Sequence, residues 1–406
     1  MNRIVKIENL DHYGRGVARS DTPIFVEEAL PNEIVEIEIT KEKKKYKEAT
    51  VIRVIEKSKD RIDAICPYFN TCGGCHLMHL SYIKTLEFKE NKVKEILQKF
   101  YDSKINIKPI LYGNDLNYRN KVTLKVQEKI GYYQKGSYDL VSIDECKLAD
   151  KQINEIIKIC YKLPLQKIEE IMIRSSYFCQ DTLVLLKLKE KINEEECIRI
   201  LKDKVNSIIL FKDKINVIYG RGYIIEKIKE FNFKISPESF FQVNSNMMIK
   251  LYDQVLYYLN PKGNERVLDY YCGTGTIGIF VSPYVKEVVG VEISNSSYKD
   301  ALENKKNNNI NNIKFYCQNA NTFKEKDFDA VIVDPPRSGL DEKTRNHLKE
   351  IKANKIIYVS CDPVTLSRDL KDLSDNYDVL EVIPVDMFPY TYHVESVTML
   401  TLKNNN

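Results

Sequence analysis

The stretch that decides the fold is VLDYYCGTGTIGI, residues 267–279. An apolar strand pattern ends near an aspartate and two tyrosines, a glycine-rich turn follows, and a helical pattern begins after it. Such a turn lets a ligand approach the backbone and the amino-terminal end of the helix. Gly273, Gly275 and Gly278 have the spacing of the dinucleotide-binding motif, but the leading LDYYC differs from it. The stretch therefore predicts an α/β domain with a ligand site at this turn.

The region around this stretch, residues 231–406, alternates between strand and helix patterns. This alternation predicts a doubly wound parallel sheet. The last two strands are joined by DMFPYTY, which is too short for a parallel crossover, so these two strands should pair antiparallel. The predicted strands, in chain order, are RVLDYY, EVVGVEI, IKFYCQN, FDAVIVD, KIIYVSC, YDVLEVIPV and HVESVTMLTL.

Two other regions precede this domain. Residues 1–57 hold short alternating strands separated by Gly and Pro-Asn breaks, which indicates a small β-barrel of the oligonucleotide-binding kind. A barrel without a ligand fits the pattern equally well. Residues 58–230 mix strand and helix patterns and predict an α+β central domain. An amphipathic helix is expected within it, over LSYIKTLEFKENKVKEILQKF at residues 80–100.

Composition narrows the class of protein without identifying a partner. The chain has 406 residues, 43% hydrophobic and 30% charged, with a formal net charge of +4. These values are typical of a globular protein with two or three domains. Neither a signal-peptide core nor a membrane-length apolar run is present, so we expect a cytoplasmic protein. The run KEKKKYKE (41–48) is either a solvated hairpin tip or a phosphate-binding one.

The glycine-rich turn resembles that of class I methyltransferases, in which an aspartate lies in the strand before the turn. There the loop wraps the methionine and ribose of S-adenosylmethionine. Glu292 ends the second strand, 19 residues beyond Gly273, where an acid can accept from both ribose hydroxyls. An ordinary surface glutamate fits one strand but not the combined pattern. We therefore expect an S-adenosylmethionine site that includes Gly273 and Glu292.

The ends of the fourth and fifth strands carry reactive groups. VIVDPPRSGL (331–340) places Asp334 after the fourth strand, and Arg337 stands where amino-methyltransferases have an aromatic residue. Cys361 follows the fifth strand, and carboxyl ends of neighbouring strands line one crevice. A thiolate that adds to carbon 6 of uracil makes carbon 5 able to attack a methyl donor. The start of the last strand supplies His393 and Glu395 as candidate bases.

The carboxy-terminal half resembles the bacterial RNA uracil-5-methyltransferase family, and within it the 23S rRNA branch. The motifs that carry the resemblance are FFQVNSNM (240–247), LDYYCGTGTIG, DPPRSGL, SCDPVTLSRDL and HVES. The resemblance implies that Cys361 is the nucleophile and Glu395 the base that removes the carbon-5 proton. It implies a donor site made of Gln242, Tyr271, Gly273, Glu292 and Asn319, with Asp334 where donor and target base meet. The family usually has Phe in place of Tyr271, and CQNAN matches its third-strand loop only loosely.

Four cysteines have the spacing of a metal site. Cys66, Cys72 and Cys75 form C-x5-C-x2-C, and Cys146 lies far downstream. Four thiolates suit zinc or an iron–sulfur cluster, and spacing alone does not decide between them. The resemblance implies a [4Fe–4S] cluster and an amino-terminal TRAM domain, both absent from the tRNA-modifying branch. It also implies that residues 76–108 pack against the catalytic domain. The other cysteines are interpreted as structural: Cys160, Cys179, Cys197, Cys272 and Cys317.

The resulting hypothesis is a monomeric enzyme that methylates carbon 5 of a flipped uridine in 23S rRNA. The alternatives are a tRNA uridine-5 methyltransferase, an RNA cytosine-5 methyltransferase and a non-catalytic RNA-binding factor. The cytosine-5 enzymes carry a Pro-Cys where this chain reads DPPR. A radical enzyme would need C-x3-C-x2-C, which the spacing of Cys66 and Cys72 does not give.

Overall fold

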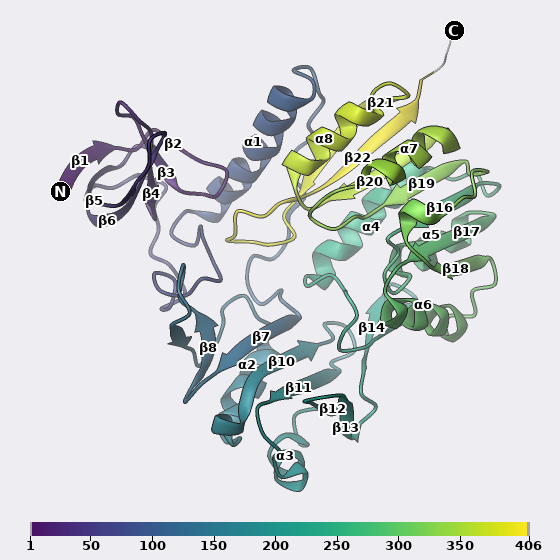
Figure 1. Ribbon diagram of the computed structural model, residues 1–406, viewed down its shortest axis with the longest axis horizontal. Helices are drawn as coiled ribbons and strands as arrows, with labels where there is room; N and C mark the ends of the chain where they lie inside the picture. Colours follow the sequence, from purple (N-terminus) through teal and green to yellow (C-terminus); the bar gives the residue numbers. More distant parts are fainter. Residues whose placement is uncertain (1, 404–406) are drawn as a thin grey trace.

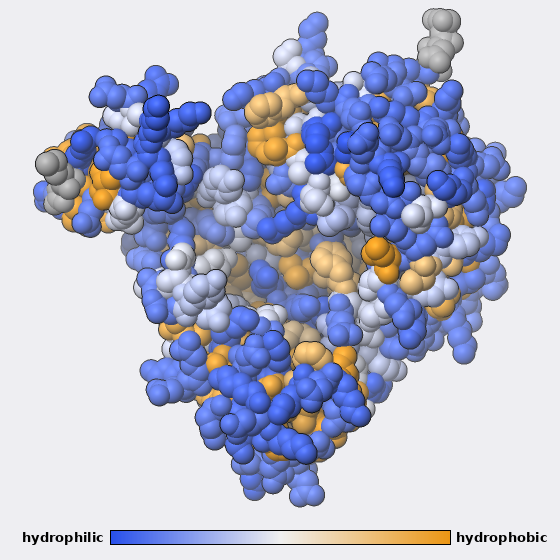
Figure 2. All heavy atoms as spheres, viewed as in Figure 1, coloured by the Kyte–Doolittle hydropathy of each residue, from blue (hydrophilic) through white to orange (hydrophobic). Residues whose placement is uncertain are grey.

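Four sheets organise the chain, and they follow one another along the sequence (Figure 1). The computed structural model describes residues 2–403. In Figure 1 the amino-terminal sheet stands at the left, the central sheet at the bottom and the carboxy-terminal sheet at the right. Figure 2 shows a recessed area between these parts, where hydrophobic and hydrophilic side chains mix. Within residues 2–403, no helix combines the length and apolar character that crossing a bilayer requires.

The amino-terminal region is one six-stranded sheet with the order β1-β5-β6-β4-β3-β2. Its pairs are antiparallel except β4 with β6. Alternate side chains, among them Ile24, Val26, Val35 and Ile37, are buried in its own core, as the period-2 pattern predicts. The strands are β1 Asn2–Lys6, β2 Asn9–Leu10, β3 Gly16–Ala18, β4 Ile24–Glu27, β5 Ile34–Glu42 and β6 Lys47–Glu56.

The central region is a seven-stranded mixed sheet with the order β13-β12-β11-β10-β7-β8-β9. Its separate core includes Ile156 and Ile157 from a helix and Ile171 and Leu186 from the strands. The elements are β7 Lys121–Val126, β8 Ile130–Tyr133, β9 Leu140–Ser142, α2 Lys151–Cys160, η1 Leu165–Lys167, β10 Ile168–Ser175, β11 Thr182–Leu188, α3 Glu194–Leu201, β12 Ser207–Phe211 and β13 Ile215–Gly220.

Two elements from the earlier part of the chain pack on the carboxy-terminal domain. Helix α1, Tyr82–Phe100, contacts α8 and β21, and its Leu86, Val93 and Leu97 lie in that domain's core. The hairpin of β14 Ile224–Ile228 and β15 Phe231–Ile235 also packs there. This hairpin crosses residues 230 and 231, so the boundary drawn from the sequence passes through a paired unit. The pairing of β14 with β15 keeps these two strands together in one unit, and the local sequence pattern does not reveal this pairing.

The carboxy-terminal sheet is doubly wound with the order β18-β17-β16-β19-β20-β22-β21. All neighbours are parallel except β22, which pairs antiparallel with β20 and β21 as the short connection predicts. The elements are α4 Ser245–Leu259, β16 Arg266–Tyr270, α5 Thr276–Val281, η2 Ser282–Tyr284, β17 Glu287–Glu292, α6 Asn295–Asn307, β18 Ile313–Cys317, η3 Ala320–Thr322, β19 Ala330–Val333, α7 Glu342–Ile351, β20 Lys355–Ser360, α8 Pro363–Leu373, β21 Tyr377–Val385 and β22 Glu395–Leu402.

The strand order reverses between β16 and β19, because the chain runs outward from β16 to β18 and then returns to β19. In open α/β sheets, ligands bind in the crevice at such a switch point, outside the carboxyl ends of the strands. The glycine-rich turn, Asp334 and Cys361 all follow strands at this edge. The fold thus brings the predicted donor site and the predicted nucleophile to one edge of the sheet.

Candidate functional site

The turn after β16 has the backbone of a ligand loop. Tyr271, Gly273 and Gly275 have φ values of 62°, 56° and 80°, a left-handed conformation that favours glycine. Gly278 leaves little room for a side chain, because a Cβ atom there would lie 3.0 Å from Asp269 Oδ2, which would have to move slightly. A Cβ atom at Gly273 would meet nothing within 4 Å. The backbone at Gly273 is therefore open to an approaching ligand. At Gly278, the missing side chain allows α5 to pack closely on β16.

Glu292 is joined directly to this loop. Its Oε2 accepts a hydrogen bond from the Gly273 amide at 3.0 Å, and its Oε1 accepts one from the Ser294 amide at 2.6 Å. The carboxylate is thus fixed at the end of β17, and each oxygen retains a lone pair for a further donor. The two predicted donor-site residues Gly273 and Glu292 are in contact.

A cavity of about 440 Å³ next to the loop contains two more predicted residues, Tyr271 and Asn319. Asn319 caps the short helix η3, where its side chain accepts from the Asn321 amide at 3.1 Å. Gln242 and Asp334 are not among the residues that line this cavity. Gln242 is only 5% exposed and precedes α4. The predicted donor-site residues are therefore distributed over the loop, the cavity, the segment before α4 and, for Asp334, the position after β19.

Cys361 and Glu395 lie close to each other at the ends of two paired strands. The ladder between β20 and β22 ends with Ser360 opposite Ser396, where Cys361 follows β20 directly and Glu395 begins β22. Glu395 is near enough for its charge to act on the Cys361 thiol. Glu395 is 4% exposed, and its Oε2 has no hydrogen-bond partner within residues 2–403. A buried, unpartnered carboxylate oxygen beside a thiol is the arrangement that the two-residue mechanism needs.

Burial and mutual repulsion dominate the electrostatics of these groups. Burial, together with Asp334, raises the pKa of Glu395 to about 8, and burial raises that of Asp334 to about 7. Burial, Glu395 and Asp334 raise the pKa of the Cys361 thiol to about 12, while the Arg337 guanidinium acts in the opposite direction. A carboxyl group with a pKa of about 8 is mostly protonated at neutral pH, so Glu395 would have to release that proton before it could act as a base. The Cys361 thiol, likewise, would have to lose its proton before it could act as a nucleophile.

His393, the other candidate base, is held next to a cation. Its Nε2 lies 3.4 Å from Arg337 Nη2. Burial, Arg337 and His76 lower the pKa of His393 to about 3, so its imidazole is neutral at physiological pH. The sequence did not indicate this Arg337–His393 contact, since the two residues are far apart in the chain.

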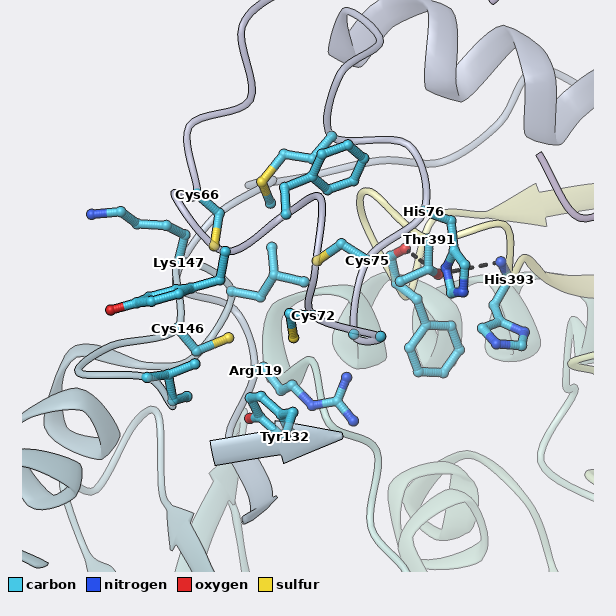
Figure 3. Close-up of a pocket in the computed structure, with 18 of the residues that line it drawn as sticks. Cys66, Cys72, Cys75, His76, Arg119, Tyr132, Cys146, Lys147, Thr391 and His393 are labelled. Carbon is cyan, nitrogen blue, oxygen red and sulfur yellow. Dashed lines mark hydrogen bonds between the residues drawn. The ribbon is translucent and has the colours of Figure 1, made fainter. Parts of the chain in front are cut away.

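The four predicted metal-ligating cysteines line one cavity of about 340 Å³ (Figure 3). Figure 3 shows the sulfur atoms of Cys66, Cys72, Cys75 and Cys146 pointing into a common space, with Arg119 and Tyr132 below it. Burial and the neighbouring thiols raise the pKa of Cys72 to about 11 and raise that of Cys75 further. Arg337 and His393 line the same cavity. The four thiols therefore lie near the edge of the carboxy-terminal sheet that carries Arg337 and His393.

Four thiols are a donor set that either zinc or a four-iron cluster can use. A single zinc ion draws its sulfur ligands to about 2.3 Å from one centre. A four-iron cluster is larger and binds each thiolate at a different iron. Within residues 2–403, no three His, Cys, Asp or Glu side chains are grouped closely enough to hold one metal ion. The shared cavity and the four thiols are the features that a cluster would use.

Residues 81–327 and 319–403 match the family described as tRNA (uracil-5-)-methyltransferase. The chain belongs to the RNA uracil-5-methyltransferase family. Members of this family are S-adenosylmethionine-dependent enzymes of the class I methyltransferase fold, which agrees with the order of the carboxy-terminal sheet. Residues 3–52 match the TRAM domain, which confirms the interpretation of the amino-terminal strands.

Relatives of this methyltransferase match over almost its whole length. Uncharacterised RNA methyltransferases of Halalkalibacterium halodurans and Staphylococcus aureus are 36% and 34% identical, and each match covers 98% of this chain and 97% of the relative. The solved tRNA (uracil-54, C5)-methyltransferase of Pyrococcus abyssi, in complex with S-adenosyl-L-homocysteine, is 28% identical with a TM-score of 0.82. That match covers 98% of this chain and 99% of the other. A tRNA enzyme therefore shares the full span, so the amino-terminal sheet does not separate rRNA from tRNA enzymes.

Proposed function

We propose that this methyltransferase modifies carbon 5 of a uridine in 23S rRNA, with Cys361 as nucleophile and Glu395 as base. The observation that carries the proposal is that Cys361, directly after β20, and Glu395, the first residue of β22, come together where the two strands pair, with Asp334, directly after β19, near both. A cytosine-5 enzyme would need a second cysteine that DPPR lacks, and a non-catalytic factor would have no need of a buried, unpartnered carboxylate.

The reaction proceeds in three steps. The Cys361 thiolate adds to carbon 6 of uracil, and the carbon 5–carbon 6 double bond becomes an enolate. Carbon 5 then attacks the donor methyl, whose bond to sulfur breaks. Glu395 takes the carbon-5 proton, the electron pair restores the double bond, and the carbon–sulfur bond to Cys361 breaks. Arg337 favours the thiolate in the first step, because its charge opposes the groups that raise the pKa of Cys361.

The methyl donor is S-adenosylmethionine. The open backbone at Gly273 and the cavity beside Tyr271 support its placement at the glycine-rich turn. The remaining lone pairs of Glu292 can accept from ribose hydroxyls. The residues that we expect to bind it are Gln242, Tyr271, Gly273, Glu292, Asn319 and Asp334.

Cys66, Cys72, Cys75 and Cys146 would hold a [4Fe–4S] cluster. Their shared cavity and four-thiol donor set support this assignment. When bound, the cluster joins the loop over residues 66–75 to the segment around Cys146 and offsets the mutual repulsion of the thiolates. Its role in this chain is then to fix the loop that lies next to Arg337 and His393.

The RNA is held by the TRAM domain and the recessed area shown in Figure 2. The lysines of the run at 41–48 include Lys43, Lys44 and Lys45 at the exposed turn between β5 and β6, which suits phosphate contacts. The target uridine must leave its stack to reach the buried thiol. We expect the enzyme to work as a monomer in the cytoplasm.

The alternative substrate is tRNA, because the Pyrococcus abyssi protein that shares the full span is a tRNA enzyme. The test is methylation in vitro of 23S rRNA and of bulk tRNA, both taken from a strain that lacks this gene, followed by mapping of 5-methyluridine. We expect incorporation into 23S rRNA. Incorporation into tRNA alone would overturn the rRNA assignment and leave the chemistry intact.

A further inference from the structure

The segment that leads into Glu395, residues 386–394, is held in place from outside itself. It joins β21 to β22. Its carbonyl oxygens accept hydrogen bonds from residues that are distant in sequence. The bonds, written donor to acceptor, are Asn244 Nδ2 to Met387 O (3.2 Å), Lys89 Nζ to Phe388 O (2.8 Å), Tyr118 Oη to Pro389 O (3.2 Å), the His76 and Leu77 amides to Tyr390 O (3.0 Å each) and Lys92 Nζ to Tyr392 O (2.9 Å).

One of these anchors includes a buried ion pair. Lys89 on α1 pairs with Asp386 at the start of the segment, and both side chains are fully buried. Tyr82 Oη donates to the other oxygen of Asp386 at 2.8 Å. An ion pair out of contact with water is retained only when its remaining hydrogen-bonding groups are satisfied. Lys89 meets that requirement through the Phe388 carbonyl, so the pair fixes the backbone of the segment as well as its first side chain.

This arrangement differs from that of an ordinary connection between strands. A surface loop usually satisfies its carbonyls with its own amides or with water. Here four carbonyls accept from residues 76–118, about 300 positions away in the chain, and of the four the Phe388 carbonyl also accepts from Thr391. Those residues lie in the thiol-bearing loop, in α1 and in the strand-free stretch before β7. The amino-terminal half therefore fixes the segment that leads into Glu395, while Glu395 itself pairs with Val385 of β21.

We infer that Lys89, with Tyr82 and Tyr118, positions Glu395 for removal of the carbon-5 proton, a role that rests on the proposed function. These three are positioning residues, because none of them lies among the reacting groups. Glu395 takes the proton from carbon 5, the electron pair forms the carbon 5–carbon 6 double bond, and the Cys361 thiolate leaves. If the segment shifts, addition and methyl transfer continue, but this last step slows and the methylated covalent complex accumulates.

The test follows the two halves of the reaction separately. Full-length enzyme is given RNA that carries tritium at carbon 5 of uridine, and a donor with a labelled methyl group. Wild type should release one tritium for each methyl transferred. Lys89→Met should slow tritium release by about tenfold relative to methyl transfer, and a denaturing gel should show the trapped complex. Equal losses in both signals would overturn the inference, because a general loss of structure affects both halves.

Three further variants complete the design. Tyr82→Phe combined with Tyr118→Phe removes two hydroxyl groups without leaving a charge unpaired, so it tests the inference even if Lys89→Met does not fold. Lys108→Met removes an exposed ion pair with Glu381 of β21. This variant should leave the ratio of tritium release to methyl transfer unchanged. Glu395→Gln removes the proposed base itself and should trap the methylated covalent complex. A complex trapped with Glu395→Gln but not with the positioning variants rejects only the inference, whereas no complex with Glu395→Gln rejects the base assignment.

Discussion

Cys361 and Glu395 lie at the adjoining ends of β20 and β22, and the segments beside them are held in different ways. The position of Cys361 is set locally. Ser360 Oγ donates to the Asp362 carbonyl at 3.0 Å, and the Asp362 side chain caps α8 by accepting from the Val364 and Thr365 amides at 2.8 and 3.0 Å. Glu395 pairs with Val385 of β21, but the segment between these two residues has carbonyls that are bound by residues from the other half of the chain.

Local and distant contacts respond differently to damage elsewhere in the protein. A locally built site survives as long as its own strand and helix form, because its contacts are close in sequence. A site built on distant contacts depends on the packing of separate regions. We therefore expect damage to the amino-terminal half to affect the late, base-dependent step before it affects the nucleophile.

The largest expected effect comes from the thiol cavity. Enzyme purified without oxygen should contain about four iron and four sulfide per chain. Cys146→Ser should lose this metal and at least about 3 kcal/mol of unfolding free energy, as measured by metal analysis and denaturant unfolding. Cys179→Ser, an exposed thiol outside the cavity, is the control. Zinc in place of iron would contradict the cluster assignment.

A second prediction uses pH to examine Glu395. Its pKa rises from an ordinary 4.5 to about 8 on folding, so the folded protein binds the extra proton. That stabilisation is complete below about pH 4.5 and is lost as the pH rises towards 8. Glu395→Gln should therefore lose less stability than wild type between pH 5 and pH 8.5, by about 1–3 kcal/mol in urea unfolding.

The exposed carboxyl of Glu350, paired with Lys326, supplies the control for the pH experiment, and Glu350→Gln should follow wild type. Part of the decrease of unfolding free energy with rising pH should persist in Glu395→Gln, because burial also raises the pKa of Asp334 and Asp269. Identical slopes for wild type and Glu395→Gln would mean that Glu395 is ionised in the folded protein at neutral pH.

A smaller effect is expected from the local anchor. Asp362→Ala removes the cap of α8 and should cost about 1 kcal/mol of stability. It should slow formation of the covalent complex and leave its breakdown unchanged, which is the opposite of the result expected for Lys89→Met. Asp150→Ala, which removes the cap of α2, should cost similar stability with no effect on the complex. Slower breakdown of the covalent complex in Asp362→Ala would contradict the separation between local support of Cys361 and distant support of Glu395.

The smallest effect on chemistry should follow from the exposed turn of the TRAM domain. Replacing Lys43, Lys44 and Lys45 by Glu should weaken RNA binding and reduce the salt dependence of affinity, by up to about 0.9 in slope for each phosphate that is no longer neutralised. The rates of complex formation and breakdown at saturating RNA should not change. A salt slope equal to that of wild type would show that the run is only solvated.

Much of this molecule could be predicted from the sequence, because its signals are local. The strand–turn–helix around Gly273 and the βα alternation follow from patterns within a few residues. The short DMFPYTY connection likewise fixed the antiparallel direction of β22. The nucleophile and the base remain predictions, but their positions at adjacent strand ends follow from the same local reasoning.

What the sequence did not reveal depends on distant contacts. Lys89 has the spacing of a buried helix face but the chemistry of a surface residue, so its partner Asp386 could not be anticipated. The hairpin of β14 and β15 crosses the expected domain boundary because its apolar residues pack on the carboxy-terminal core. The contact between Arg337 and His393 likewise exists only in the folded chain.

The central claim is that Cys361 forms the covalent bond to uracil and Glu395 resolves it. The direct measurement is a denaturing gel of labelled target RNA with wild type, Cys361→Ala and Glu395→Gln, with Cys317→Ala as an exposed-thiol control. Glu395→Gln should trap a methylated protein–RNA complex, and RNA with fluorine at carbon 5 should trap wild type and Cys317→Ala. Cys361→Ala should give neither complex nor turnover. A covalent complex with Cys361→Ala, or full turnover by Glu395→Gln, would contradict the account.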